Sequence, residues 1–201
     1  VAGRGGLPAA VEQVERAVSK NVFVFRSDVK SYYASIDHDR LLELVRTLVH
    51  DADVVALLEQ YVRHSVNADG HYRDVSRGIC LGCSLSPLMG AIYLMPLDEA
   101  LQDCGLHYAR YMDDWVVLAP TRLKLRKAIR VTNQVLQRLR IRQHPNKTFI
   151  GRIAAKFSFL GFTFGEAGIV SVAVATMAKF VARCIRFYER NATIARVGEY
   201  R

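Results

Sequence analysis

Tyr111-Met112-Asp113-Asp114 is the most informative stretch of this sequence, and alternating or continuous apolar runs flank it at 107–110 and 115–119. Two such runs around a short polar tip predict a β-hairpin. Adjacent carboxylates at a hairpin tip repel each other, and a divalent cation is the usual way to offset that repulsion. The tip therefore predicts part of a metal-dependent active site. Ordinary turn formation is the alternative, because Asp is also a common turn residue.

A further carboxylate stands at the end of an expected strand near the N-terminus. Residues 22–25 form a continuous β-forming run, which Arg26-Ser27-Asp28 follows. A buried strand that ends in Asp commonly directs the carboxylate into a cleft. In a split βαβ layout this strand and the 107–119 hairpin lie side by side in one antiparallel sheet. Asp28, Asp113 and Asp114 would then converge.

The chemistry of such a cluster is phosphoryl transfer. Carboxylates are hard oxygen ligands, so three of them at one site predict binding of two Mg²⁺ ions, with Mn²⁺ as a substitute. Two such ions could activate a 3′ hydroxyl and stabilise a leaving pyrophosphate. Phosphoryl transfer of this kind needs positioning and charge neutralisation rather than covalent chemistry from the protein.

Helix signals divide the rest of the chain. Helices are expected at 8–20, after Asp37, after Asp53, from Pro87 toward Asp103, after Thr121 and at 176–190. Side-chain oxygens of Asp37, Asp53, Ser86 and Thr121 are the predicted N-caps. Asp69-Gly70 indicates a turn or hairpin. The alternating run 157–164 predicts a strand that pairs across 165–168 with 169–174.

Composition narrows the class of protein. The chain has 201 residues, of which 51% are hydrophobic and 23% charged, as in one globular domain. The formal net charge of +9 suits a polyanionic partner such as nucleic acid, although solubility alone would also account for it. No apolar run approaches the length of a membrane span and no signal pattern is present, so we expect a cytoplasmic protein without a membrane partner.

The cysteines do not predict a metal centre. Cys80 and Cys83 have a spacing seen in zinc and redox sites, but no second Cys or His pair completes a zinc site. Together with Cys104 and Cys184 they are expected to be reduced and mostly buried.

Five stretches follow one another along the chain, namely Phe25 to Tyr33, Arg77-Gly78 through Ser86-Pro87-Leu88, Tyr111 to Asp114, Lys147-Thr148 and Phe159-Leu160-Gly161-Phe162. In this order they resemble reverse transcriptases, most closely the bacterial type related to group II intron proteins and retrons. They extend over about residues 20–165, and their shared order makes the signal specific where any one alone would be weak.

The resemblance implies a metal site and a proton donor. It implies that Asp28 and Asp113 are metal ligands, that Asp114 completes the acidic cluster and that the carbonyl of Val29 faces a metal. Lys147 resembles a lysine proposed to protonate the leaving pyrophosphate; an ordinary surface lysine is the alternative.

The resemblance also implies contacts to nucleotide and primer. The nucleotide-binding residues that it implies are Lys30, Tyr32, Tyr33, Leu81 and Gly82. Tyr33 would crowd a 2′ hydroxyl and so favour deoxynucleotides, although it also suits core packing. Phe159, Leu160 and Gly161 resemble a hairpin that grips the primer end. Leu81 departs from relatives, which commonly have Gln there; since Leu cannot donate a hydrogen bond, contact at this position would come from backbone or packing.

The resemblance implies an α/β (α+β) fold, namely a polymerase palm with an antiparallel sheet and flanking helices. The expected division is 1–20 as a lead-in with partial fingers, 21–174 as palm with finger-side helices at about 39–76, and 175–201 as the start of a thumb. The chain is then either a palm-centred piece or a compact relative with small fingers and thumb.

The implied activity is that of an RNA-directed DNA polymerase, with an RNA template, a DNA or RNA primer and deoxynucleoside triphosphates as partners. Two alternatives stay open: an untemplated or protein-primed polymerase of a defence system, and a non-catalytic, maturase-like RNA-binding module. The sequence leaves open the oligomeric state, the priming mode and the genetic element.

Overall fold

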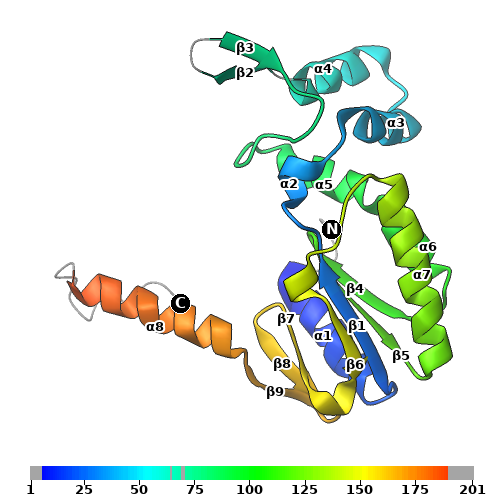
Figure 1. The fold of residues 1–201 in the computed structure, drawn as a ribbon, viewed down its shortest axis with the longest axis vertical. Helices are drawn as coiled ribbons and strands as arrows, with labels where there is room; N and C mark the ends of the chain where they lie inside the picture. The colour runs from blue at the N-terminus through cyan, green and yellow to red at the C-terminus, as the bar shows by residue number, and fades with distance from the viewer. Residues whose placement is uncertain (1–5, 64, 69–70, 190–201) are drawn as a thin grey trace.

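An antiparallel sheet forms the centre of the molecule (Figure 1). The structure is a computed structural model that describes residues 6–63, 65–68 and 71–189. The strand order of the central sheet is β4-β5-β1-β6. The strands are β1 (Phe23–Asp28), β4 (His107–Tyr111), β5 (Asp114–Ala119) and β6 (Phe149–Arg152). All neighbouring pairs are antiparallel, and the predicted placement of β1 beside the β4–β5 hairpin is confirmed.

Helices and smaller sheets surround this centre. The helices are α1 (Gly6–Val18), α2 (Tyr32–Ser35), α3 (His38–Leu48), α4 (Ala52–Val62), α5 (Ser86–Tyr93), α6 (Met95–Gln102), α7 (Arg122–Arg138) and α8 (Val174–Glu189). Short 3₁₀ turns, η1 (Pro145–Lys147) and η2 (Ile153–Ala155), flank β6. The other strands are β2 (Ser65–Ala68), β3 (His71–Asp74), β7 (Phe157–Phe159), β8 (Phe162–Gly165) and β9 (Gly168–Val172).

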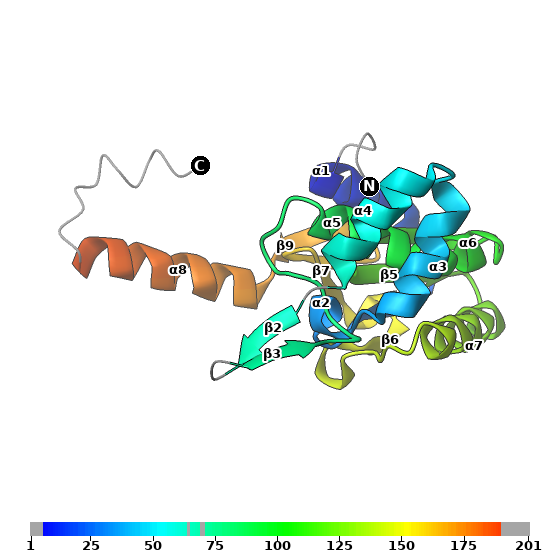
Figure 2. The same cartoon turned by 90° about the horizontal axis from the view of Figure 1, so that it is seen from above.

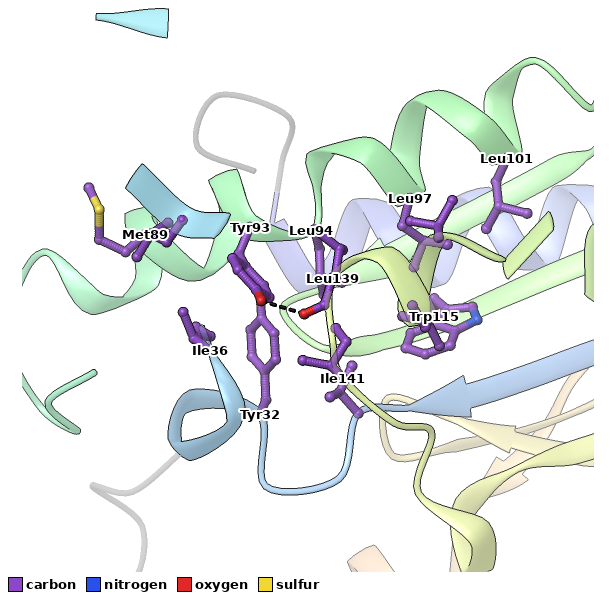
Figure 3. Packing of buried hydrophobic residues seen from close by; sticks show 14 of the residues in the cluster. Tyr32, Ile36, Met89, Tyr93, Leu94, Leu97, Leu101, Trp115, Leu139 and Ile141 are labelled. Atoms are coloured by element: carbon purple, nitrogen blue, oxygen red, sulfur yellow. Dashed lines mark hydrogen bonds between the residues drawn. The ribbon is translucent and has the colours of Figure 1, made fainter. Parts of the chain in front are cut away.

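The central sheet separates two apolar clusters, because successive side chains of a strand point to opposite faces. Phe25, Trp115 and Val117 face a cluster that includes residues of α3, α5, α6 and α7. Figure 3 shows Leu97 and Leu101 of α6 packed with Trp115 in this cluster. Val24 and Val116 face the second cluster, which includes residues of α1, β7 and β8. Because both faces of the sheet are covered, its side chains can reach a ligand only at the ends of the strands. The end with Asp28 and Asp114 is the polar one.

Two of the four predicted N-caps are confirmed, and the one predicted for α4 is wrong. The side chain of Asp37 accepts a hydrogen bond from the Arg40 amide at 3.2 Å, and that of Thr121 accepts one from the Lys124 amide at 3.3 Å. The cap of α4 is Asp51 rather than Asp53, because the Asp51 carboxylate accepts the amides of Asp53 and Val54. Asp53 itself is the second residue of the helix.

The helix predicted from Pro87 to Asp103 is two helices, α5 and α6, which meet at Leu94. Pro96 has no N–H group and cannot continue the backbone ladder, which accounts for the break. The prediction of Ser86 as N-cap is also wrong. Ser86 is the first helical residue, and its hydroxyl donates to the Cys80 carbonyl and contacts the Tyr61 hydroxyl at 2.8 Å.

The alternating run 157–164 is not one strand but two, β7 and β8, joined at Leu160-Gly161. Phe157 pairs with Phe164 and Phe159 with Phe162, while Leu160 and Gly161 have φ angles of 47° and 87°. Positive φ at both central residues is typical of a tight two-residue hairpin turn. The second predicted turn is confirmed, since Gly165 of β8 pairs with Gly168 of β9.

Two elements project from the rest. The strands β2 and β3 pair as the predicted hairpin, with Ala68 opposite His71, while Asp69 and Gly70 lie outside the described residues. Helix α8, predicted at 176–190, extends away from the sheet and has no buried residue (Figure 2). Within the described ranges, no helix is both long enough and apolar enough to span a membrane.

Candidate active site

The β4–β5 turn places two carboxylates at one end of the central sheet. Tyr111 of β4 pairs with Asp114 of β5, so Met112 and Asp113 form the turn between them. Met112 has a φ of 57°, which is unfavourable for a residue with a Cβ atom. The hairpin predicted from the sequence is thus present, and its acidic tip is formed by a strained turn.

Asp28 lies directly beside this tip. It is the last residue of β1 and pairs in register with Asp114 across the β1–β5 ladder. Residues that oppose each other in an antiparallel pair direct their side chains to the same face. The Asp28 side chain is 8% exposed and that of Asp114 is 22% exposed. The three predicted aspartates therefore gather at one end of the sheet.

The surroundings of the aspartates at this end of the sheet disfavour their ionised forms. Burial raises the pKa of Asp114 to about 6, and the neighbouring Asp28 and Asp113 add to that rise, although Arg26 Nε lies 3.5 Å from the Asp114 carboxylate. Burial also raises the pKa of Asp113, to which the charge of Asp28 contributes. A bound cation would offset both effects, because an opposite charge nearby favours the ionised carboxylate.

Lys147 contacts the cluster from η1. Its Nζ donates a hydrogen bond to Asp28 Oδ2 at 2.5 Å, and this bond raises the pKa of the lysine. The Lys147 side chain is half exposed, so the ion pair is in contact with solvent. Lys147 and Asp28, which the resemblance implies as site residues, thus lie side by side.

The residues present fit a divalent metal by chemistry. Oδ1 of Asp28 and Oδ1 of Asp114 are buried without a hydrogen-bond partner, and buried carboxylate oxygens without a partner are costly. Hard oxygen ligands of this kind suit Mg²⁺ or Mn²⁺. Among the described residues, no three His, Cys, Asp or Glu side chains are already drawn together as a metal site. The Lys147 ammonium instead neutralises Asp28.

Beyond Asp28 the chain passes along the segment that precedes η1. Val29 is buried and forms an isolated bridge with Gln143, and the Lys30 amide donates to the Arg142 carbonyl at 2.9 Å. The exposed side chain of Lys30 lines a cavity of about 990 Å³. The other cationic side chains that line this cavity are Arg77, Arg140 and Arg142.

Of the two neighbouring tyrosines, the structure buries one and leaves the other accessible. Tyr32 is 5% exposed and its hydroxyl donates to the Gly90 carbonyl of α5, so its ring belongs to the core (Figure 3). Tyr33 is only partly buried, and the charge of Asp113 adds to the effect of burial in raising its pKa. Tyr33 is therefore the tyrosine that can face a ligand near the aspartates.

The loop between β3 and α5 carries the next predicted residues. Leu81 is 75% exposed, and Gly82 has a φ of 88° with no atom near its missing side chain. The structure shows no contact between either residue and the aspartates. Cys80, in the same loop, is exposed, and Cys83 is partly exposed, as are Cys104 and Cys184, so the expectation that the cysteines are mostly buried is wrong.

The predicted primer-grip residues lie at the β7–β8 turn. Phe159 is buried in the second apolar cluster, and Leu160 packs against that cluster. The Gly161 carbonyl accepts a hydrogen bond from the Ala173 amide at 2.8 Å, just before α8. The turn itself is available for contact, whereas the Phe159 ring supports it from within.

Sequence reasoning missed three charged residues that contact the acidic tip or its strand. Arg26 pairs with Asp114, Arg110 donates to the Met112 carbonyl at 2.7 Å, and Asp98 of α6 binds Arg110. The position of Arg26 two residues before Asp28 was a signal for the first, since i and i+2 share a strand face. No local signal links Asp98 to the hairpin.

The central sheet with its covered faces and its acidic end defines a mixed α/β protein with a polymerase-type fold. Residues 6–164 match the family described as reverse transcriptase (RNA-dependent DNA polymerase), and the chain belongs to this family.

Two curated relatives support this assignment. Protein YkfC of Escherichia coli (strain K12) is 26% identical over 191 residues, which covers 74% of this chain and 50% of YkfC. An uncharacterized 91 kDa protein in a cob intron of Schizosaccharomyces pombe is 28% identical over 76 residues, which covers 38% of this chain and 9% of that protein. The chain thus spans half or less of these relatives, and the bacterial and intron-encoded sources agree with the predicted kind of reverse transcriptase.

Solved structures agree on the fold. Apo telomerase from Candida tropicalis, truncated from its C-terminal domain, has a TM-score of 0.65 and 15% identity, and covers 82% of this chain and 39% of that one. Telomerase from Candida albicans in complex with a TWJ fragment of telomeric RNA has a TM-score of 0.62 and 13% identity. The match covers 83% of this chain and 33% of that one. At these identities the likeness concerns the fold alone.

Proposed function

We propose that this chain forms the catalytic palm of an RNA-directed DNA polymerase, which adds deoxynucleotides to a primer 3′ end. The observation that carries the proposal is the convergence of Asp28, Asp113 and Asp114 at one end of the sheet in a reverse transcriptase family chain. The partners would be an RNA template, a DNA or RNA primer and deoxynucleoside triphosphates. The formal net charge of +9 suits these polyanions.

The acidic end of the sheet would hold Mg²⁺, or Mn²⁺ as a substitute. Asp28 and Asp113 would be the principal ligands, Asp114 would complete the charge, and the Val29 carbonyl would add an oxygen. When bound, the metal would lower the pKa of the primer 3′ hydroxyl and neutralise charge on the leaving pyrophosphate. Oδ1 of Asp28 and Oδ1 of Asp114 support this role, since both are buried and neither accepts a hydrogen bond in the structure.

Lys147 would supply the proton that the leaving pyrophosphate needs. Its ion pair with Asp28 raises its pKa, so the ammonium is protonated at neutral pH. The half-exposed side chain has room to exchange Asp28 for a phosphate oxygen. Proton transfer from a positioned side chain typically accelerates a reaction by about 10²–10⁴-fold.

The nucleotide would lie between Tyr33, the loop with Leu81 and Gly82, and the cationic cavity beside Lys30. Tyr33 would contact the sugar and exclude a 2′ hydroxyl, while the buried Tyr32 supports it from a ring-centre distance of 5.4 Å. The exposed Leu81 would pack on the base, because its side chain cannot donate a hydrogen bond. Lys30 would contact the triphosphate.

The primer end would rest on the turn of β7 and β8. Leu160 and Gly161 form that turn, and Phe159 anchors it in the core. On this proposal residues 1–20 belong to a lead-in with partial fingers, residues 21–174 to the palm with finger-side helices at about 39–76, and residues 175–201 to the start of the thumb.

Primer extension on an RNA template with Mg²⁺ tests the proposal. We expect extension by the parent chain. Asp113→Ala should lower the extension rate about a thousandfold or more, because it removes a proposed ligand of the metal that stabilises the transition state. Asp103→Ala, which removes an exposed carboxylate at the end of α6, is the matched control and should extend normally.

The same assay separates the alternatives. Products without added template would favour an untemplated or protein-primed polymerase. RNA binding without extension by the parent, unchanged in Asp113→Ala, would favour a non-catalytic, maturase-like module. Equal extension by parent and Asp113→Ala would contradict the assignment of the acidic site.

A further inference from the structure

A buried arginine lies directly below the acidic turn. The Arg110 side chain of β4 is 5% exposed. Its Nε donates to Asp98 Oδ1 at 2.7 Å, and its Nη2 donates to Asp98 Oδ2. Such a two-point contact between guanidinium and carboxylate is both strong and directional. It joins strand β4 to helix α6.

A further hydrogen bond supports the Arg110–Asp98 pair. The hydroxyl of Tyr108, two residues before Arg110 on the same face of β4, donates to Asp98 Oδ1 at 2.6 Å. Burial lowers the pKa of Arg110, but the hydrogen bonds and charge of Asp98 raise it more, so the guanidinium stays charged. A buried ion pair often adds no net stability over an apolar replacement, so stability alone does not account for this one.

The remaining arm of the guanidinium reaches the acidic turn itself. Arg110 Nη1 donates to the Met112 carbonyl at 2.7 Å. Met112 is the turn residue with a φ of 57°, and a side chain in that region is strained unless its surroundings hold it there. The next residue is Asp113. The backbone atom that Arg110 holds is thus in the peptide group that leads into Asp113.

We propose that Arg110 and Asp98 are positioning residues, forming a clamp that fixes the Met112–Asp113 turn and so orients the Asp113 carboxylate toward Asp28. The Arg110–Asp98 clamp would position a residue of the proposed polymerase reaction, so this inference rests on the proposed function. Neither residue touches the reacting groups. Both act through the backbone of the turn.

A purely structural role does not account for the clamp. Helix α6 is already attached to the sheet by Leu97 and Leu101, which are fully buried in the same cluster as Trp115 (Figure 3). An apolar pair in place of Arg110 and Asp98 would preserve that attachment. Only the guanidinium can bind the carboxylate with one edge and the Met112 carbonyl with the other.

The test replaces the clamp with apolar residues of similar volume in the full chain. The variant carries Asp98→Leu, Arg110→Met and Tyr108→Phe together, because apolar replacement of a buried ion pair often preserves stability. We expect a melting temperature close to that of the parent. Amide exchange of residues 111–114, measured by NMR, should accelerate about tenfold or more, since the turn loses its anchor.

Steady-state kinetics provide the second readout. A displaced Asp113 should lower kcat about tenfold to a hundredfold, because a misplaced group loses the reactive geometry, while KM for the nucleotide stays within about twofold. Arg63→Met, which removes surface ion pairs to Asp39 and Glu59, is the control and should change neither exchange at 111–114 nor kcat.

Each outcome is decisive. Parent-like exchange and kcat in a folded apolar variant would overturn the inference. If amide exchange accelerates in the variant but the parent chain shows no primer extension, the clamp is upheld and the proposed function is contradicted. If the apolar variant does not fold, Arg110→Lys gives the same test, since lysine keeps the charge but cannot bind Asp98 and Met112 with a planar fork.

Discussion

Lys147 is the residue whose role can be separated most sharply from that of its neighbours. Its ammonium neutralises Asp28 at 2.5 Å, where a metal ion would otherwise act on the same carboxylate. On the proposed function the lysine has two opposing effects: it competes with metal for Asp28 and it supplies a proton during the reaction.

We expect Lys147→Met to lower the rate of nucleotide addition by about 100-fold, because a positioned proton donor is lost. The same variant should bind Mn²⁺ about three- to tenfold more tightly, because a like charge next to the site is removed. Single-turnover extension and a Mn²⁺ titration measure the two effects. Lys127→Met on the exposed face of α7 is the control, and an unchanged rate in Lys147→Met would identify an ordinary surface lysine.

Asp37 gives a prediction about pH and stability. Burial raises its pKa, but the hydrogen bond from the Arg40 amide and the ion pair with Arg140 lower it more, so the net pKa lies below the ordinary value. A depressed pKa contributes stability that is complete above the unfolded-state pKa and is lost as the pH falls through the folded-state pKa.

Asp37→Ala should lower the free energy of unfolding by about 1 kcal/mol at neutral pH, as expected for loss of an N-cap. The difference from the parent should shrink once the pH falls below about 4, where the carboxylate of the unfolded chain becomes protonated, and should vanish below the lower folded-state pKa. Urea unfolding across pH measures it. Asp37→Asn, which keeps a capping oxygen, should lose less, and a pH-independent difference would contradict the assigned cause.

The residue-scale predictions from sequence succeeded where one chemical option existed. Thr121 is the single capping candidate at the start of its helix, and it is the cap. Asp51 and Asp53 are equivalent by composition, and only the backbone geometry at the start of α4 selects the first. The same limit hid Arg110, because its partner lies on a different element.

At the scale of elements, the β7–β8 turn combines strain with a proposed contact to primer. Gly161 has a φ of 87°, and an added Cβ would lie 3.2 Å from the Thr176 hydroxyl at the start of α8. Gly82 has a similar φ of 88° but no atom within 4 Å. The two glycines therefore share backbone strain and differ in their surroundings.

We expect Gly161→Ala to destabilise the chain by about 1–2 kcal/mol more than Gly82→Ala, because only the former adds a steric contact to the unfavourable φ. Chemical denaturation of both variants gives the comparison. Equal losses would show that the α8 end moves freely away from the turn. They would argue against the turn as a rigid support for a primer.

The elements also show why a sequence pattern can mislead. The run 157–164 predicts one strand because apolar and polar residues alternate in it, yet the alternation changes phase at Leu160-Gly161, where the chain reverses. Leucine is a poor residue for positive φ, so the local turn signal comes from the neighbouring Gly161 and from the hairpin that the resemblance implies. The packing of Phe157, Phe159 and Phe164 in the second cluster imposes the reversal.

At the scale of the whole molecule, the order of strands is what makes a site. Asp28 and Asp113 are 85 positions apart in the numbering, yet the order β4-β5-β1 brings the end of β1 beside the β4–β5 turn. The sequence predicted this neighbourhood, since the strand and hairpin signals were strong and the order of stretches resembled one family. It did not predict that Lys147 and Arg26 neutralise the cluster, because those contacts depend on side-chain geometry.

The most direct test of the account is a Mn²⁺ titration of the full 201-residue chain followed by electron paramagnetic resonance. The central claim is that Asp28 and Asp113 hold a divalent cation. The account predicts saturable binding by the parent, a loss of about tenfold or more in affinity for Asp28→Asn and for Asp113→Asn, and parent-like binding for Asp103→Asn. Equal binding by the parent and both site variants would contradict it.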